Sequence, residues 1–396
     1  MTEPYPIISS GKVTGLIAGG GDAIRVCGIE AVCRLYFWVD SQIAVEVGNM
    51  VEGKNLWIDG TRVPIGAWLV HPPLLTARVV SDLDEYVEWL YKRVRKKLAG
   101  KTVLLGYSGG KDSTAALLIL LKLQKLVGFK LKPVYIHFPY LEPPQYMSFV
   151  DRVAKRLSIH IEFLEPKKRD VKTLLKWKGL PRRGNRWCTY YKVKPMRELR
   201  KKLGNPIEVV ADRATEAPKR LERLKTRLEE LEPLRGKKLN PVYMLSVLDV
   251  AAILRKYNLV HPDYLLGSPR IACLMCPFRA LHEFPSNWLD RLEDPGLIEE
   301  VLAREHKKWY AEIPFEDFIY YHLWRYPRPI ALRVWRAHRG LAFYAEGLEK
   351  LQRWQVVHAF RSVWVERLPE KPRIGLEELG EKLLKAWRQG IPILTP

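Results

Sequence analysis

The residues best suited to chemistry form a short glycine-containing loop. They are Ser108, Gly109, Gly110, Lys111, Asp112 and Ser113. The two glycines permit a sharp turn whose backbone N–H groups can come close to phosphate oxygens. Lys111 can neutralise phosphate charge and the serines can donate hydrogen bonds, while Asp112 can hold Mg²⁺ or fix the loop from within. We therefore predict that this loop binds the phosphates of a nucleotide.

Cysteines form a second set of reactive residues. Cys273 and Cys276 stand in a C-x-x-C pattern, and Cys188 lies far from them in the sequence. The odd total of five cysteines, in a chain that opens without a secretory pattern, argues against a disulfide framework. Three thiolates are one ligand short of a Cys₄ metal site. Cys27 or Cys33 can supply the fourth, although their spacing is more typical of core residues.

Cys188 stands in a basic segment that also contains Arg182, Arg183 and Arg186. Positive charge stabilises a thiolate, so we expect these arginines to lower the pKa of Cys188. Cys188, Cys273 and Cys276 can then hold a metal, with zinc as one alternative, or serve as free or redox-active thiols. The residues alone leave these alternatives open.

The glycine-containing loop must be presented by the elements on either side of it. Residues 102–107 are a short apolar run that suits a buried parallel strand, and residues 114–126 are predicted to be helical. Further strands are predicted at 132–138, 159–164 and 206–210, and further helices at 81–98, 145–157 and 221–231. This alternation predicts an α/β fold with a doubly wound parallel sheet. The helix after the loop would turn its positive end toward a bound anion.

Three segments of the chain differ in pattern. We predict a small β-rich domain at 1–80, a nucleotide-binding domain at 81–294 and a helical domain at 295–396. The last segment combines basic and aromatic side chains, which can grip phosphates and stack on bases but are also ordinary packing material for helices. They are Trp324, Arg325, Tyr326, Arg328, Arg333, Trp335, Arg336, His338, Arg339, Arg353, Trp354 and Arg361. Both roles remain open for them.

The charge balance is strongly one-sided. The chain has 66 Lys and Arg against 44 Asp and Glu, which gives a net charge of +22. Surface ion pairs explain many charged residues but not a surplus of one sign, so we expect a polyanionic partner such as a nucleic acid. No apolar run is long enough to span a membrane, and no basic stretch before an apolar core opens the chain. We therefore expect a cytoplasmic protein without a membrane partner.

The glycine-containing loop resembles the PP-loop of the ATP pyrophosphatases, also called adenine nucleotide alpha hydrolases. Later elements narrow the resemblance to the phosphoadenosine phosphosulfate reductase family. Three groups of residues carry it: Arg186, Trp187, Cys188, Thr189, Lys192 and Pro195; then Arg213, Glu216 and Arg220; then Gly267, Arg270, Cys273, Cys276 and Pro277. The resemblance covers residues 100 to 290. Ala211 and Ala217 replace a Gly and a Ser of the family pattern, which weakens the middle element.

The resemblance implies how the site works. Enzymes of this kind cleave ATP between the α and β phosphates, adenylate a substrate and release pyrophosphate, so ATP and Mg²⁺ are the expected cofactors. Lys111, Asp112 and Cys188 would be catalytic, and Arg186, Lys192 and Arg213 would contact phosphate or sulfate. Some family members hold a [4Fe–4S] cluster. Here Cys188, Cys273 and Cys276 would be its ligands, with zinc as the alternative.

Three functions are compatible with these features. The first is an ATP-dependent sulfur transferase that acts on a nucleic acid such as tRNA and takes its sulfur from a donor protein. The second is a phosphoadenosine or adenosine phosphosulfate reductase. The third is a non-catalytic nucleic-acid-binding protein. The resemblance disfavours the reductase, because such reductases tend to have a degenerate PP-loop and a nucleophilic cysteine on a C-terminal tail, whereas no cysteine follows Cys276.

Overall fold

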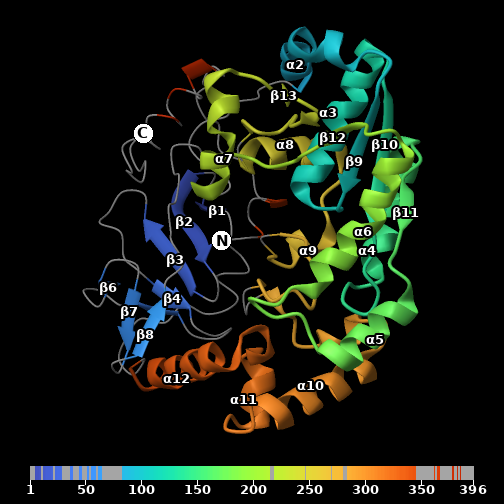
Figure 1. The fold of residues 1–396 in the computed structure, drawn as a ribbon. Coiled ribbons are helices and arrows are strands. Elements are labelled where there is room, and N and C mark those ends of the chain that lie inside the picture. The colour runs from blue at the N-terminus through green and yellow to red at the C-terminus, as the bar shows by residue number, and fades with distance from the viewer. Residues whose placement is uncertain are drawn as a thin grey trace.

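Figure 1 shows the fold in a computed structural model. It describes residues 83–344 except 215–217, 246, 269 and 280–282, together with short strands before residue 65 and single positions between 361 and 384. The early strands form three small antiparallel sheets, in agreement with the β-rich pattern of that segment. They are β1 (Tyr5–Ser9), β2 (Lys12–Gly20), β3 (Ala23–Gly28), β4 (Tyr36–Trp38), β5 (Ala44–Glu46), β6 (Val51–Glu52), β7 (Asn55–Ile58) and β8 (Thr61–Pro64). Cys33 lies outside the described residues.

A six-stranded sheet forms the centre of the molecule. Its strands are β9 (Thr102–Tyr107), β10 (Lys130–Ile136), β11 (Glu162–Leu164), β12 (Ile207–Val209), β13 (Leu234–Arg235) and β14 (Lys238–Leu239), in the order β11-β10-β9-β12-β14-β13. All pair in parallel except β13, the antiparallel edge strand. The predicted doubly wound parallel sheet is therefore confirmed, with β9 and its following loop at its centre.

Helices cover both faces of this sheet (Figure 1). Val103, Leu105 and Tyr107 of β9 share one buried core with α2 (Leu83–Leu98), α3 (Lys111–Val127), α4 (Gln145–Leu157) and α8 (Val247–Tyr257). Side chains alternate along a strand, so Gly106 faces the other side. There the Met196 side chain of α6 (Trp187–Lys202) comes within 3.5 Å of the position that a Cβ on Gly106 would occupy.

Several element boundaries differ from the predicted ones. Strand β10 spans 130–136 rather than 132–138, and β12 spans 207–209 rather than 206–210. Helix α3 begins at Lys111 rather than at residue 114, because Gly110 is its N-cap residue in an extended conformation. Lys111 and Asp112 therefore belong to the first helical turn, where the free N–H groups of a helix lie. Strand β11 is limited to Glu162–Leu164, the part that pairs with β10. The charged helix predicted at 221–231 is α7 (Pro218–Glu229).

A second buried core lies beneath the carboxyl end of the sheet. It joins Phe138 and Leu141 to α5 (Lys168–Lys178), α10 (Pro295–Trp309), α11 (Phe315–Tyr320) and the start of α12 (Arg328–Tyr344). The helices after residue 295 thus share a core with the middle of the chain, and the domain limits stay a prediction. Among the described helices, none combines the length and the apolar character that crossing a bilayer requires.

This second core corrects the interpretation of part of the basic and aromatic C-terminal segment. Trp324 and Arg325 are completely buried and Tyr326 is 2% exposed, so these side chains are packing residues. The Arg325 guanidinium donates hydrogen bonds to backbone carbonyl groups, including that of His322 at 2.9 Å. Such bonds satisfy a buried cation, which explains how an arginine can lie in this core. Trp335 also donates to Asp317, at 2.7 Å.

Candidate functional site

The loop between β9 and α3 is held in shape by its own side chains. Gly109 has a φ of +72°, which favours glycine. The Ser108 and Ser113 hydroxyls lie 2.9 Å apart, and the Gly110 N–H contacts Ser108 Oγ at 3.3 Å. The Ser113 hydroxyl also donates to the Gly110 carbonyl at 3.0 Å. The serines therefore fix the turn at the positive end of α3, where a phosphate is favoured.

Lys111 is the first residue of α3, directly after this turn, and is buried, with 4% of its surface exposed. Its ammonium is 3.7 Å from Asp112 Oδ2, and its backbone N–H donates a 2.8 Å hydrogen bond to the Tyr264 hydroxyl. A Cβ on Gly110 would come within 3.6 Å of the same hydroxyl. Tyr264 comes from α9 (Pro262–Leu265), so a residue distant in sequence completes the loop.

Asp112 is the anionic centre of the loop. Its Oδ1 accepts a 2.6 Å hydrogen bond from Arg213 Nε, while its Oδ2 faces Lys111. Burial alone would raise the pKa of Asp112, but the charges of Arg213 and then Lys111 outweigh it and hold this pKa below its usual value. Both carboxylate oxygens are thus engaged by cations. Asp112 does not fit a Mg²⁺ ligand here; it fixes the loop from within, which was the alternative prediction.

Arg213 is completely buried beside Asp112, and its Nη1 contacts the Leu245 carbonyl at 3.5 Å. In this position Arg213 orients the carboxylate of Asp112. The predicted contact of Arg213 with phosphate stays a prediction. Of its neighbours in the resembling pattern, Arg220 binds Asp212 and Glu216 lies outside the described residues.

The support of Tyr264 was not predicted from the sequence. His261 caps α9 by accepting a 3.1 Å hydrogen bond from the Asp263 N–H. Asp263 also accepts from the Tyr146 hydroxyl at 2.5 Å and pairs with Arg291 at 2.8 Å. On its other side, Tyr264 stacks on Trp364, with ring centroids 4.5 Å apart. The available sequence signal was only the position of Tyr264 three residues before Gly267 of the C-x-x-C element.

His261 makes this support sensitive to pH. Burial lowers its pKa to about 4; the charge of Asp263 opposes the shift, while Arg291, Arg279 and Arg152 add to it. Between about pH 6.5 and pH 4 the unfolded chain binds a proton here and the folded chain does not. We therefore expect the free energy of unfolding to fall by about 3 kcal/mol across this window as pH decreases.

Chemical denaturation of wild type and His261→Asn at pH 7 and pH 4.5 measures this effect. An asparagine oxygen can still cap α9 but does not titrate. We expect the variant to lose less stability than wild type over the interval, whatever its stability at pH 7. Equal losses in the two proteins would contradict the assignment to His261.

The three cysteines come together near the start of α6. Cys188 lies in the first turn of α6, and Cys273 and Cys276 are joined by a turn in which the Cys276 N–H donates to the Cys273 carbonyl at 3.0 Å. Burial raises the pKa of Cys188, Cys276 adds to this, and Arg186 opposes it without compensating. The expected low pKa of Cys188 is therefore wrong. Two of the three arginines are occupied elsewhere: Arg182 binds Glu305 at 3.0 Å and Arg183 binds the Pro277 carbonyl at 2.9 Å.

Lys192 lies between the cysteines and a carboxylate that the sequence did not reveal. Its ammonium is 3.4 Å from Glu142 Oε2 and 3.6 Å from Cys273 Sγ. Glu142 is 2% exposed, accepts from the Phe138 N–H at 2.9 Å and faces His137. Burial raises the pKa of Cys273 to about 12, against the opposing charge of Lys192. The predicted phosphate contact of Lys192 stays a prediction, because its ammonium here serves the thiol and Glu142.

A metal is not supported by this arrangement. Within the described part of the chain, no group of three or more His, Cys, Asp or Glu side chains can hold a metal ion. The ammonium of Lys192 also lies against the Cys273 sulfur, where it would compete with a cation. The cysteines therefore do not fit a cluster or a zinc ion as placed, and we derive no chemical step from either.

A parallel sheet whose central strand leads through a Ser-Gly-Gly-Lys-Asp-Ser turn into a helix defines an adenine nucleotide alpha hydrolase-like fold. Within that class, residues 102–279 match the model of the phosphoadenosine phosphosulfate reductase domain. This match confirms the resemblance of the loop and the later elements to that family.

Individual relatives are distant. The chain is 26% identical over 88 residues to a glutamine-hydrolysing GMP synthase from Brachyspira hyodysenteriae, a match that spans 22% of this chain and 16% of that protein. A solved U34-tRNA thiolase from Methanococcus maripaludis, with its [4Fe–4S] cluster, is 12% identical and has a TM-score of 0.33; the match covers 67% of this chain and 82% of that one. An NH₃-dependent NAD synthetase from Campylobacter jejuni is 14% identical, with a TM-score of 0.29 and coverages of 59% and 95%. Likeness at this level says nothing about the substrate.

Proposed function

We propose that the protein is an ATP-dependent sulfur transferase that adenylates a nucleic acid, such as tRNA, and releases pyrophosphate. The observation that carries this proposal is the intact turn between β9 and α3. In it, Lys111 and Asp112 are locked by Arg213 and Tyr264 at the positive end of a helix. A buried lysine beside a preorganised turn is suited to stabilising the charge that develops on departing phosphates.

The proposed reaction has two steps. An oxygen of the acceptor attacks the α-phosphate of ATP, the bond to the β-phosphate breaks and pyrophosphate leaves. A persulfide on one of Cys188, Cys273 and Cys276, loaded by a sulfur donor, then attacks the adenylated carbon with its outer sulfur, and the bond from that carbon to the oxygen of AMP breaks. A second of these thiols attacks the inner sulfur, which leaves the outer sulfur on the acceptor and a disulfide between the two cysteines that an external thiol reduces. The chain contributes the N–H groups of the turn and the charge of Lys111. Mg²⁺ would share the charge of the phosphates, but Asp112 is engaged by Arg213 and Lys111, so we assign it no Mg²⁺ ligand on this chain.

Release of pyrophosphate from ATP, measured with and without bulk tRNA, tests this proposal. We expect release that depends on RNA in wild type and a loss of at least about tenfold in Lys111→Met, because a single buried charge of this kind contributes several kcal/mol to transition-state stabilisation. Lys125→Met is the matched control, since Lys125 is exposed in the last turn of the same helix, and it should keep wild-type activity.

Other outcomes would identify the alternatives. Sulfite formed from a phosphosulfate nucleotide and a thiol, without consumption of ATP, would establish the reductase in place of the transferase. Cys188 would then have to be the nucleophile, although burial raises its pKa. Binding of RNA without formation of pyrophosphate or sulfite would identify a non-catalytic nucleic-acid-binding protein.

A further inference from the structure

More than half of the positive surplus of the chain lies in one short segment. Residues 167–202 contain fifteen Lys and Arg but only two acidic residues, Asp170 and Glu198. The segment comprises α5, the loop after it and α6, and it contains Cys188. The start of α6 is tied to the end of α5 by a 3.1 Å hydrogen bond from Trp187 Nε1 to the Gly179 carbonyl. A concentrated positive charge therefore adjoins the cysteines.

One face of α6 carries a continuous basic stripe. It consists of Arg186, Tyr190, Lys194, Arg197 and Lys201, all exposed and spaced so that they share one side of the helix. Fifteen residues of helix extend the stripe over about 22 Å. Within the described residues, Lys194, Arg197 and Lys201 have no acidic partner. Ion pairing inside the protein thus does not account for them.

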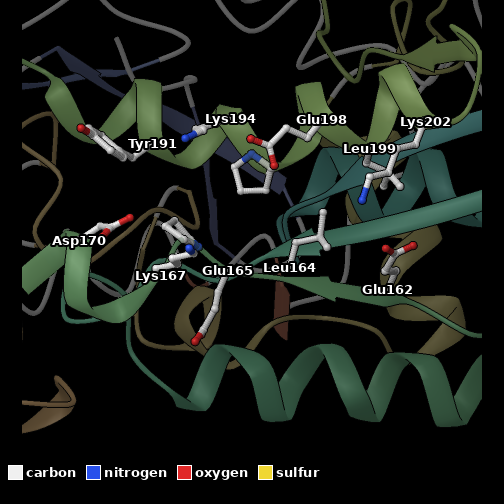
Figure 2. Close-up of a pocket in the computed structure, with 12 residues that line it drawn as sticks. Glu162, Leu164, Glu165, Lys167, Asp170, Tyr191, Lys194, Glu198, Leu199 and Lys202 are labelled. Atoms are coloured by element: carbon white, nitrogen blue, oxygen red, sulfur yellow. The ribbon is translucent and has the colours of Figure 1, made fainter.

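A pocket of about 480 Å³ lies beside this stripe, between α6 and the start of α5. Figure 2 shows Tyr191, Lys194 and Glu198 along α6, with Lys167 and Asp170 of the other wall below them. Three lysines and four carboxylates line it: Lys167, Lys194 and Lys202, with Glu162, Glu165, Asp170 and Glu198. The ammonium groups suit phosphate, while the carboxylates and the Tyr191 phenol suit the N–H groups and the ring of a base. This mixture fits a nucleotide unit better than a bare anion.

An exposed aromatic ring stands at the other end of α5. The Trp177 side chain is 79% exposed, and the Lys178 ammonium lies 5.2 Å from its ring centroid. Trp177 is two residues from Gly179, whose carbonyl accepts a hydrogen bond from Trp187, so its backbone lies near the start of α6. An open indole among cations is the combination on which unpaired bases stack.

We infer that the surface formed by α5 and α6 binds single-stranded RNA, with phosphates along the stripe, a base on Trp177 and the strand leading to Cys188. This inference rests on the proposed function, which supplies the nature of the substrate. It adds the part of the surface on which that substrate lies. Of the basic and aromatic C-terminal residues, Trp324, Arg325 and Tyr326 are buried and do not face such a substrate.

Anisotropy of a labelled single-stranded RNA 12-mer, in a series of salt concentrations, tests the stripe. Lys194→Glu with Arg197→Glu should weaken binding at least about tenfold and reduce the slope of log affinity against log salt by about 1.4, since each phosphate contact on a single strand contributes about 0.7. Lys92→Glu with Lys96→Glu on α2 is the control. It makes the same change of net charge on the opposite face of the sheet and should change affinity less than about twofold. Equal effects of the two double variants would overturn the inference.

Trp177→Ala tests the stacking. It should weaken binding of the single strand by about five- to hundredfold but leave binding of duplex RNA nearly unchanged, because paired bases are already stacked. An unchanged affinity for the single strand would overturn this part. Thermal unfolding of each variant verifies that it is folded, which is expected for substitutions of exposed side chains.

The same samples separate this inference from the proposed function. If Lys194→Glu with Arg197→Glu loses RNA binding while wild type shows no RNA-dependent pyrophosphate release, the RNA-binding surface is supported and the transferase activity is refuted. If the same double variant releases pyrophosphate at the full RNA-dependent rate, the transferase activity is supported and the RNA-binding surface is refuted.

Discussion

Asp112→Ala is expected to lower the free energy of unfolding by about 3–5 kcal/mol, because it leaves the buried guanidinium of Arg213 without its counter-ion. Arg213 is completely buried and lies 2.6 Å from the lost carboxylate. The variant should also release no pyrophosphate, since the same carboxylate positions Lys111 at the turn. Denaturant titration and the pyrophosphate assay measure the two effects separately.

The matched control for this variant is Asp84→Ala. Asp84 pairs with Lys122 at 2.5 Å, but its side chain is 67% exposed, so the loss should stay below about 1 kcal/mol. Similar losses for Asp84→Ala and Asp112→Ala would contradict a structural role for the buried pair. In wild type, the folded protein holds the pKa of Asp112 below its usual value. The carboxylate therefore contributes its full stabilisation at any pH above the usual carboxyl pKa. This stabilisation is lost as the pH falls through the lowered pKa of the folded state.

Gly179→Ala is the second substitution with a large expected effect, again about 3–5 kcal/mol of stability. Gly179 ends α5 with φ +75° and ψ −162°, a region that is nearly restricted to glycine and costs other residues about 1–3 kcal/mol. A Cβ there would lie 1.6 Å from Glu305 Oε1, which accepts hydrogen bonds from the Leu180 N–H and Arg182. Relief of that overlap adds a further 1–3 kcal/mol or more.

Gly128→Ala provides the comparison. Gly128 also has a positive φ, +76°, at the end of α3, but no atom lies within 4 Å of its added Cβ. Only the backbone penalty of about 1–2 kcal/mol applies there. If calorimetry gave the two variants the same loss of stability, the contact with Glu305 would not contribute to the effect of Gly179→Ala. Since Trp187 binds the Gly179 carbonyl, Gly179→Ala should also displace the start of α6 and raise the alkylation rate of Cys188.

The elements around the turn between β9 and α3 were predictable because their signals are local. The apolar run of β9, the two glycines and the apolar periodicity of α3 follow one another directly in the chain, and the bounds of β9 and α4 were predicted to the residue. The start of α3 was placed three residues late, because the lysine and aspartate of the turn were assigned to the loop rather than to the first helical turn.

The supporting contacts were not predictable for a physical reason. Tyr264 reaches the Lys111 N–H across 153 positions of sequence, and Lys192 meets Cys273 across 81. Such pairs depend on tertiary packing, which no periodicity encodes. The same applies to Cys188: neighbouring arginines in sequence predicted a low pKa, whereas burial, a property of the fold, raises it. Arg325 likewise looks like a surface residue until its core is formed.

The stacking of Trp364 on Tyr264 connects a late part of the chain to the turn between β9 and α3. Tyr264 Oη holds the Lys111 N–H, and the indole of Trp364 covers the phenol ring. Displacement of this indole would free the phenol to rotate and release the Lys111 N–H. A change at Trp364 would thereby alter the turn between β9 and α3. Because the chain has 13 tryptophans, the difference in fluorescence between wild type and Trp364→Phe would report it.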